Sequence, residues 1–493
     1  MSKTIIPREL HGTKLIGYSI GFFGLFLTNL LISVFAFQFY VYTINLNSLI
    51  VSIGIAIRLI LSALFSIIFG VMTDNKKPGK FGKRRPFLIY GLPIFVLTSI
   101  LIWLPPWYCP KNNSIFLPTA FFFFVVIILN AISGTLILSA HISMLPEQSQ
   151  THNNRKSVAS MNTFFTIIAS TLAMMLPLIV ESILEDPEKV KHWEPSGKVI
   201  LFYMPLIGLG FAIFGLISII LTFFSVDESF HKTSPETEIK KVSLLATFQQ
   251  MLQPAKDKKY RKFLAVRYFN SFATRILGIL VIPFLAFVLK FKGIDFYIYI
   301  FVSIFCKFGW FFIWKKILDK EKHSLIKIYS LCIISSIIAS YLEIFFLINI
   351  LSFEFKIILF VITIGTLLGA VYSFRLFAIP LAGVLIYEAA EKLENHDTEK
   401  AISELSGSYF GLDNFMFSFG QASATIMVGI ILLGPNSENP IIITLCLCSM
   451  GLFFLISLVI LGRIKLQKDI SDIDIVKIES KEISKIDMQP QNN

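Results

Sequence analysis

Three arginines, one aspartate and two asparagines stand within long apolar stretches of the sequence. They are Arg58, Asn162, Arg275, Arg375, Asp413 and Asn414. A charged side chain inside a bilayer costs several kcal/mol unless it faces a partner or a wet cavity. Their positions therefore predict that these six residues line a central path for a substrate or for a coupling ion.

The cations within these stretches outnumber the acids, and this excess has two interpretations. In one, Arg58, Arg275 and Arg375 pair with acids such as Asp413 or Glu343 and hold helices together. In the other, the positive charge is uncompensated and awaits an anionic group on a substrate. The asparagine amides likewise fit either sugar hydroxyls or bonds between helices.

Arg267 has a different expected role, because it lies only about one turn from the predicted end of its apolar stretch. Long basic side chains near the end of a membrane helix extend their charge into the interface. We therefore expect Arg267 to snorkel and not to enter the path.

The elements that must position these residues are membrane helices. Of the 493 residues, 55% are hydrophobic and only 15% are charged, so the apolar surface is too large for one aqueous core. Apolar runs of about 20 residues, long enough to cross about 30 Å of hydrocarbon, recur along the chain. We count twelve such spans, which predicts an all-α integral membrane protein.

Signatures of soluble enzymes are missing from the sequence. It contains no G-x-x-x-x-G-K-[ST] phosphate loop, no H-E-x-x-H, no paired C-x-x-C and no G-x-S-x-G. The five cysteines are odd in number and four of them lie within predicted spans. We therefore expect no enzymatic activity, no bound cofactor, no metal site and no disulfide framework.

The basic residues predict the orientation of the chain. If both termini face the cytoplasm, the inside segments hold 32 of the 44 Lys and Arg residues and the outside segments hold seven. This asymmetry is the positive-inside pattern. It accounts for the net charge of +12 through topology and membrane lipids, without nucleic acid as a partner.

A long polar interruption divides the spans six and six. We predict a cytoplasmic N-terminus at 1–14, a six-helix bundle at 15–225, a cytoplasmic linker at 226–262, a second six-helix bundle at 263–463 and a flexible cytoplasmic tail at 464–493. In the linker, "SLLATFQQML" predicts a short amphipathic helix after Ser243, lying either on the membrane surface or on the protein.

Three stretches of sequence carry a family resemblance. "GVMTDNKKPGKFGKRRPFLIYGLP", "SAHISMLPEQSQTHNNRKSVASMNTFFTIIASTLAMMLP" and "GSYFGLDNFMFSFGQASATIMVGIILLG" resemble motifs of the major facilitator superfamily, in the form used by glycoside-pentoside-hexuronide:cation symporters of the melibiose permease type. The resemblance implies the major facilitator fold, with two six-helix bundles that alternate access to a central site.

The resemblance also implies a cytoplasmic gate. Asp74, Arg84 and Arg85 match the loop between the second and third spans, and Glu147 and Arg155 match its companion after the fourth. In that interpretation the aspartate binds arginines and helix N-terminal amides in one closed state and releases them in the other.

Departures from the family pattern concern coupling. Ser62 and Ser66 stand where similar members have two aspartates that bind the coupling cation, and Leu138 and Ser418 replace a further acid and a lysine. Na+ coupling is therefore not carried over. Asp413 is the candidate for proton coupling, and an uncoupled carrier is the alternative.

The function expected from these features is secondary transport. The predicted cargo is a small hydrophilic solute, namely a sugar, glycoside or hexuronate, with H+ (or Na+) as the candidate coupling ion. The alternatives are a lysolipid or other organic-anion carrier of the same fold, an uncoupled facilitator, and a non-transporting membrane sensor. We expect a monomer in the cell membrane, in contact with lipids and with both termini in the cytoplasm.

Overall fold

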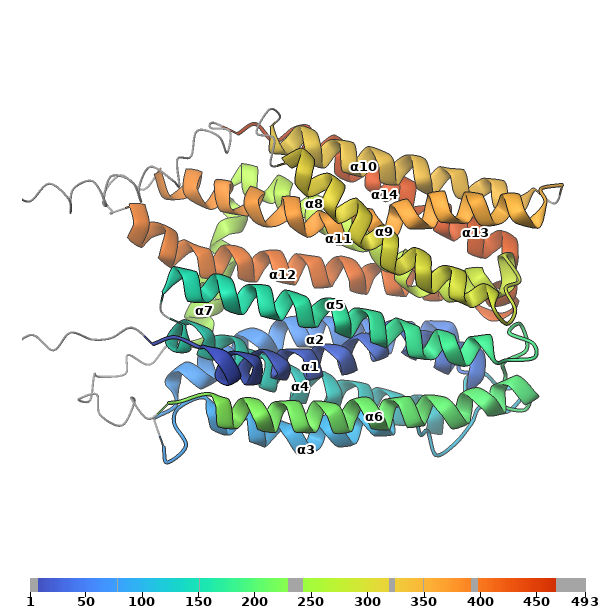
Figure 1. Ribbon diagram of the computed structural model, residues 1–493, viewed down its shortest axis with the longest axis horizontal. Helices are drawn as coiled ribbons and strands as arrows, with labels where there is room; N and C mark the ends of the chain where they lie inside the picture. The colour runs from blue at the N-terminus through green and yellow to red at the C-terminus, as the bar shows by residue number, and fades with distance from the viewer. Residues whose placement is uncertain are drawn as a thin grey trace, which may run out of the picture.

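The computed structural model describes residues 8–77, 79–149, 151–228, 243–318, 324–348, 350–391 and 398–466. The long helices of this part of the chain run side by side along one direction (Figure 1). Eleven helical segments in the described ranges are long and apolar enough to cross a bilayer, and Arg85–Leu101 adds a shorter apolar helix. The chain is an all-α integral membrane protein of twelve transmembrane helices, as the sequence predicts.

Six long helices make up the first half. They are α1 (Gly12–Gln38, continued by a π-helical turn over Phe39–Thr43), α2 (Ser48–Asn75), α3 (Arg85–Leu101), α4 (Leu117–Gln148), α5 (His152–Ser182) and α6 (Pro195–Ser225). Gly17, Gly21 and Gly24 face α6, where a Cβ atom at each would overlap a hydroxyl-bearing side chain. The three glycines therefore let the α1 and α6 backbones approach closely, the type of contact that helices in lipid favour.

The second half follows the same plan. It contains α8 (Lys258–Pro283, continued by a π-helical turn over Phe284–Val288), α9 (Asp295–Leu318), α10 (Leu325–Leu342, continued by a 3-10 turn over Glu343–Leu347), α11 (Phe353–Glu391), α12 (Thr398–Ile431), α13 (Pro440–Cys448) and α14 (Met450–Leu461). The last two together form one span, Pro440–Leu461.

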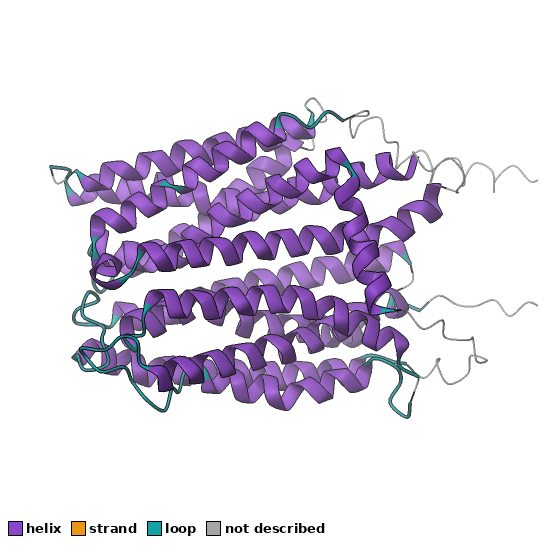
Figure 2. Ribbon diagram, turned by 180° about the vertical axis from the view of Figure 1, so that it is seen from behind, coloured by secondary structure: helices purple, strands orange, loops and turns teal. Residues whose placement is uncertain are grey.

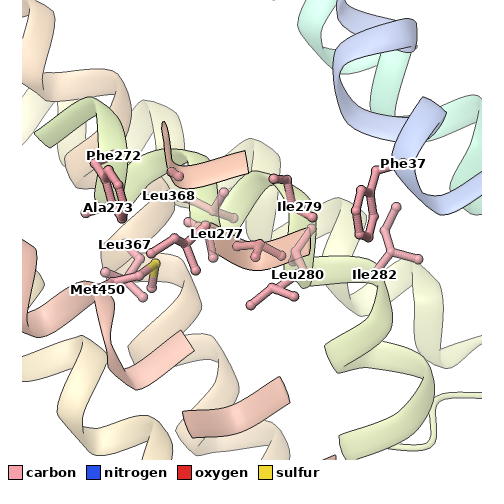
Figure 3. Packing of buried hydrophobic residues seen from close by; sticks show 14 of the residues in the cluster. Phe37, Phe272, Ala273, Leu277, Ile279, Leu280, Ile282, Leu367, Leu368 and Met450 are labelled. Atoms are coloured by element: carbon pink, nitrogen blue, oxygen red, sulfur yellow. The ribbon is translucent and has the colours of Figure 1, made fainter. Parts of the chain in front are cut away.

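Helix α8 lies at the centre of the second half. Leu277 and Phe272 on α8 are buried in the same cluster as Leu367 of α11 and Met450 of α14 (Figure 3). Phe37 of α1 belongs to this cluster too and lies beside the end of α8 in Figure 3. The helix that carries Arg275 is therefore packed within its own half and also against the other half.

Helix α7 (Leu244–Leu252) connects the halves and crosses the bundle at one end (Figures 1 and 2). It begins after Ser243, as predicted, and contacts both α2 and α12. Met251 is buried against Gly411 of α12, whereas Leu245 and Leu252 stay exposed. The helix thus packs on the protein through one part of its apolar face and leaves another part uncovered.

The described chain begins and ends at the side of the bundle where α7 lies (Figure 1). We call this side the terminal end and the other side the opposite end. Helix α8 begins at Lys258, inside the segment assigned to the linker, because the Asp257 side chain accepts a hydrogen bond from the Lys259 amide (2.7 Å) and caps it. The predicted flexible tail lies outside the described residues from 467 onward.

Candidate functional site

Arg58 and Arg275 come from opposite halves and meet on Ser33 of α1. Arg58 lies about 15 Å along α2 from its first residue, which is half the thickness of a bilayer core. Its Nη1 donates to Ser33 Oγ (3.1 Å) and its Nη2 to Asn29 Oδ1 (2.7 Å). Arg275 donates from Nη1 to the Ser33 carbonyl (3.0 Å) and from Nε to Thr425 Oγ1 (3.1 Å). We call these five residues the arginine centre.

The two arginines of the arginine centre are buried and have no counter-ion among the described residues. Arg58 is 6% exposed and Arg275 7% exposed, and every hydrogen-bond acceptor named above is neutral. In the described part of the chain neither arginine forms an ion pair, and Arg58 Nε and Arg275 Nη2 are buried without a hydrogen-bond partner. The two like charges are close enough to repel each other. Of the two interpretations of the cation excess, these two arginines fit the uncompensated one.

Asp413 and Arg267 form a buried ion pair in the second half. Arg267 Nε donates to Asp413 Oδ1 at 2.6 Å, and each side chain is 11% exposed. The guanidinium also lies over the Phe417 ring, 4.8 Å from its centroid. The expectation that Arg267 snorkels is therefore wrong. The Arg267 guanidinium instead binds Asp413, a residue predicted to line the path, because α8 and α12 pack side by side.

The other predicted path residues lie apart from the arginine centre. Arg375 of α11 and Asn414 of α12 have exposed side chains, and Asn162 of α5 is half-buried. Within the described ranges, the guanidinium groups of Arg58 and Arg275 bind Ser33, Asn29 and Thr425 and none of these three residues. The amide oxygen of Asn162 is buried without a partner among the described residues, so it remains able to accept a hydrogen bond.

The predicted cytoplasmic gate is described only in part. The side chains of Asp74, Glu147 and Arg155 lie outside the described residues. Arg84 and Arg85 open α3 at the terminal end, where Arg84 Nη1 donates to the Ser143 carbonyl and Arg85 Nη2 to the Phe223 carbonyl. These contacts stay within the first half, and the role of the gate in the transport cycle stays a prediction.

Glu228 is a residue of this region that the sequence analysis missed. Its carboxylate accepts bonds from the backbone amides of Arg84 (2.9 Å) and Arg85 (3.2 Å), and it is 1% exposed. An acid at a helix N-terminus satisfies amides that lack intrahelical partners. Gly82, with φ +94°, leaves room for it. Because Glu228 follows α6 and caps α3, no local pattern in the sequence reveals the contact.

Hydrogen bonds join the two halves at the opposite end. Tyr42 Oη donates to the Ser437 carbonyl (2.8 Å), and Ser48 Oγ lies within hydrogen-bonding distance of the carbonyls of Gly429 (2.8 Å) and Leu432 (2.9 Å). Gly429 has no side chain, which lets α12 lie directly on α2. In the conformation described here, the opposite end is closed.

Two ion pairs cross between the halves at the same end. Lys191 Nζ lies 3.5 Å from Glu438 Oε1, and Lys290 Nζ lies 3.9 Å from Glu188 Oε1. Burial lowers the pKa of Lys191, and Glu438 partly offsets this effect. These residues also escaped the sequence analysis, because they belong to separate loops that only the packed halves bring together.

Residues relevant to a coupling ion are spread over the bundle. Ser66, in the place of a cation-binding aspartate of the resembled family, donates to the Ala63 carbonyl of its own helix (2.7 Å). Glu343 is fully buried, and in the described structure neither carboxylate oxygen has a hydrogen-bond partner. No group of three or more His, Cys, Asp or Glu side chains in the described ranges could hold a metal ion.

Comparison with known proteins places these features in a family. The sequence matches the family described as MFS/sugar transport protein over residues 17–468. No curated protein matches it. Among solved structures, a mutant of the nucleoside transporter NupG is 15% identical with a TM-score of 0.60, and the match covers 92% of this chain and 100% of that one.

Two further solved structures share the fold at low identity. A D-xylose-proton symporter is 14% identical with a TM-score of 0.51, over 86% of this chain and 98% of that one. A bacterial homolog of the human lysosomal transporter Spinster, in an inward-facing and occupied conformation, is 11% identical with a TM-score of 0.60, over 91% of this chain and 95% of that one. At these identities the likeness shows the major facilitator fold alone.

Proposed function

Since the chain belongs to the MFS/sugar transport protein family, we propose that it moves a small hydrophilic solute across the membrane by alternating access. The solute class that we favour is a sugar, glycoside or hexuronate. Transporters of a nucleoside and of D-xylose, two solutes that contain a sugar, are among the structures that share the fold. Both termini lie in the cytoplasm in this proposal, in keeping with the distribution of Lys and Arg.

The observation that carries the proposal is the position of the arginine centre. It lies between the halves at about mid-membrane depth, and the Arg275–Ser33 bond crosses from one half to the other. Rocking of one half against the other breaks this bond and the contacts at the opposite end, and so exposes the centre to that side. A fixed central site with two exits is what alternating access requires.

Proton coupling is part of the proposal, with Asp413 as the residue that would bind the proton. Its only hydrogen-bonded cation in the described structure is Arg267, so protonation of the carboxylate would release that arginine. An uncoupled facilitator is the alternative.

The test is uptake into vesicles that contain the purified protein. Radiolabelled sugars, glycosides and hexuronates are supplied with an imposed pH gradient, with a Na+ gradient or with neither. We expect flux of at least one solute and accumulation driven by the pH gradient. Flux without accumulation under either gradient would assign an uncoupled facilitator, whereas no flux of any solute by a folded protein would refute the transport proposal.

A further inference from the structure

We propose that Arg58 and Arg275 together bind an oxyanion group, a carboxylate or a phosphate, on the transported solute. This inference rests on the proposed function and names the chemistry of its substrate. It is carried by three properties of the arginine centre: its charge, its unused donors and its place between the halves.

The charge of the arginine centre is out of balance. Two other partly buried basic side chains have acids: Arg267 pairs with Asp413, and Lys259 Nζ with Glu388 Oε2 at 2.5 Å. Among the described residues, Arg58 binds only the hydroxyl of Ser33 and the amide oxygen of Asn29. Arg275 binds only the carbonyl of Ser33 and the hydroxyl of Thr425. Buried charges are normally paired, because removing them from water is expensive. A pair of uncompensated guanidinium groups therefore indicates an anion that is bound for part of the cycle.

A purely structural role would not need this charge. If the pair served only to hold the halves together, an uncharged amide side chain could make the same bonds to Ser33 without the cost of burying a cation. The guanidinium group differs from an amide in presenting a fixed fork of donors that matches the two oxygens of a carboxylate or phosphate. The choice of arginine at both positions favours an oxyanion ligand.

Unused donors of the arginine centre fit such a ligand. Arg58 Nε and Arg275 Nη2 lack acceptors among the described residues. Arg275 Nη1 and Arg58 Nη1 are both held by Ser33, through its carbonyl and its hydroxyl respectively. An oxyanion that takes the place of Ser33 as acceptor would satisfy both guanidinium groups, and its charge would offset their mutual repulsion.

The experiment measures binding by purified protein in nanodiscs, by calorimetry, to glucose, glucuronate and glucose 6-phosphate. These ligands share a sugar ring and differ in the oxyanion. Lysophosphatidylglycerol, a phosphate on a lipid, is the fourth ligand. The variants are Arg58→Gln and Arg275→Gln, with Lys198→Gln as the matched control. Lys198 is exposed in the first turn of α6, so its substitution removes one positive charge away from the centre.

We expect the native protein to bind one of the two sugar oxyanions at least roughly 30-fold more tightly than glucose, the size of a desolvated charge contact. Each Arg→Gln variant should lose that preference, and Lys198→Gln should keep it. Equal affinity for glucose and for every oxyanion in the native protein, or a preference that survives in both variants, would overturn the inference.

Two additions keep the result decisive. If the Arg→Gln variants do not fold, Arg58→Lys and Arg275→Lys retain the charge without the fork, and an undiminished oxyanion preference in both would also overturn the inference. The same samples are assayed for flux. Arginine-dependent oxyanion binding without flux refutes the transport proposal and keeps the site, whereas flux of glucose without any arginine-dependent oxyanion preference keeps transport and refutes the site. A preference for the lipid phosphate alone keeps the site and refutes the hydrophilic cargo.

Discussion

Replacing Gly429 by alanine should open the end of the protein that the structure shows closed. A Cβ atom at position 429 would lie 3.0 Å from the Ser48 carbonyl and well inside van der Waals contact distance of the Ser52 side chain. Both neighbours belong to α2, in the other half. The added methyl group therefore strains the conformation in which α2 and α12 touch and leaves a conformation with separated helices unaffected.

The size of the effect follows from overpacking. Insertion of a methylene into a tight contact costs about 1–3 kcal/mol. Alanine also stabilises a helix by about 1 kcal/mol relative to glycine, but this gain is present in both conformations and cancels. The equilibrium should therefore shift roughly 5-fold to 150-fold toward the open conformation.

The assay is the distance between spin labels on the two halves. Lys189 and Lys292 are exposed in loops at the opposite end, one in each half, and each is replaced by a labelled cysteine. We expect a population with a longer distance in Gly429→Ala. Gly407→Ala is the matched control, because Gly407 lies on the same helix and has no atom within 4 Å of its would-be Cβ.

A compensating change separates the contact from other effects. Ser52→Gly removes the side chain that the new methyl group meets, so the double variant should return most of the native distance distribution. An unchanged distribution in Gly429→Ala, or the same change in Gly407→Ala, would refute the reasoning.

Three further outcomes are expected. Asp413→Asn leaves Arg267 buried without its acid and should lower the free energy of unfolding by about 3–5 kcal/mol, measured by denaturant titration; the Arg267→Met/Asp413→Leu double variant should recover most of the loss. Burial lowers the pKa of Lys191 in the closed state, so that state binds fewer protons than an open state in which Lys191 is hydrated. Raising the pH toward 10.5, the ordinary pKa of a lysine, should therefore favour the closed state with its short distance between the spin labels. Lys191→Gln should abolish this pH dependence. Burial also raises the pKa of Cys109 to about 11, so maleimide should modify it at pH 8 only after unfolding; rapid labelling of the folded protein would contradict this.

Local patterns were sufficient for the elements of this fold. The apolar runs predicted the spans because a membrane helix needs only length and composition, both of which are local. The helix after Ser243 was predicted from its periodicity, although the Ser243 side chain forms no capping bond. Its packing was left open between the membrane surface and the protein, because the answer depends on Gly411 of α12, far along the chain.

The site was predictable only as a set of candidates. Arg58, Arg275 and Arg267 all looked alike as cations in apolar surroundings, yet in the described structure one has an acid beside it and two do not. The difference depends on which residue of a neighbouring helix lies at the same depth. Glu228 and the Lys191–Glu438 pair show the same limit, since their partners come from distant segments and from loops without a pattern.

The proposed site and the proposed movement share one bond. Arg275 holds the Ser33 carbonyl of the other half, and this is the acceptor that an incoming oxyanion would replace. A ligand shifts a conformational equilibrium only through its different affinity for the two states. The two states differ in this respect. The closed state must break the Arg275–Ser33 bond to bind the anion, whereas a state with α1 and α8 apart has already lost that bond. The pair of arginines that selects the solute would then also determine which conformation the solute favours.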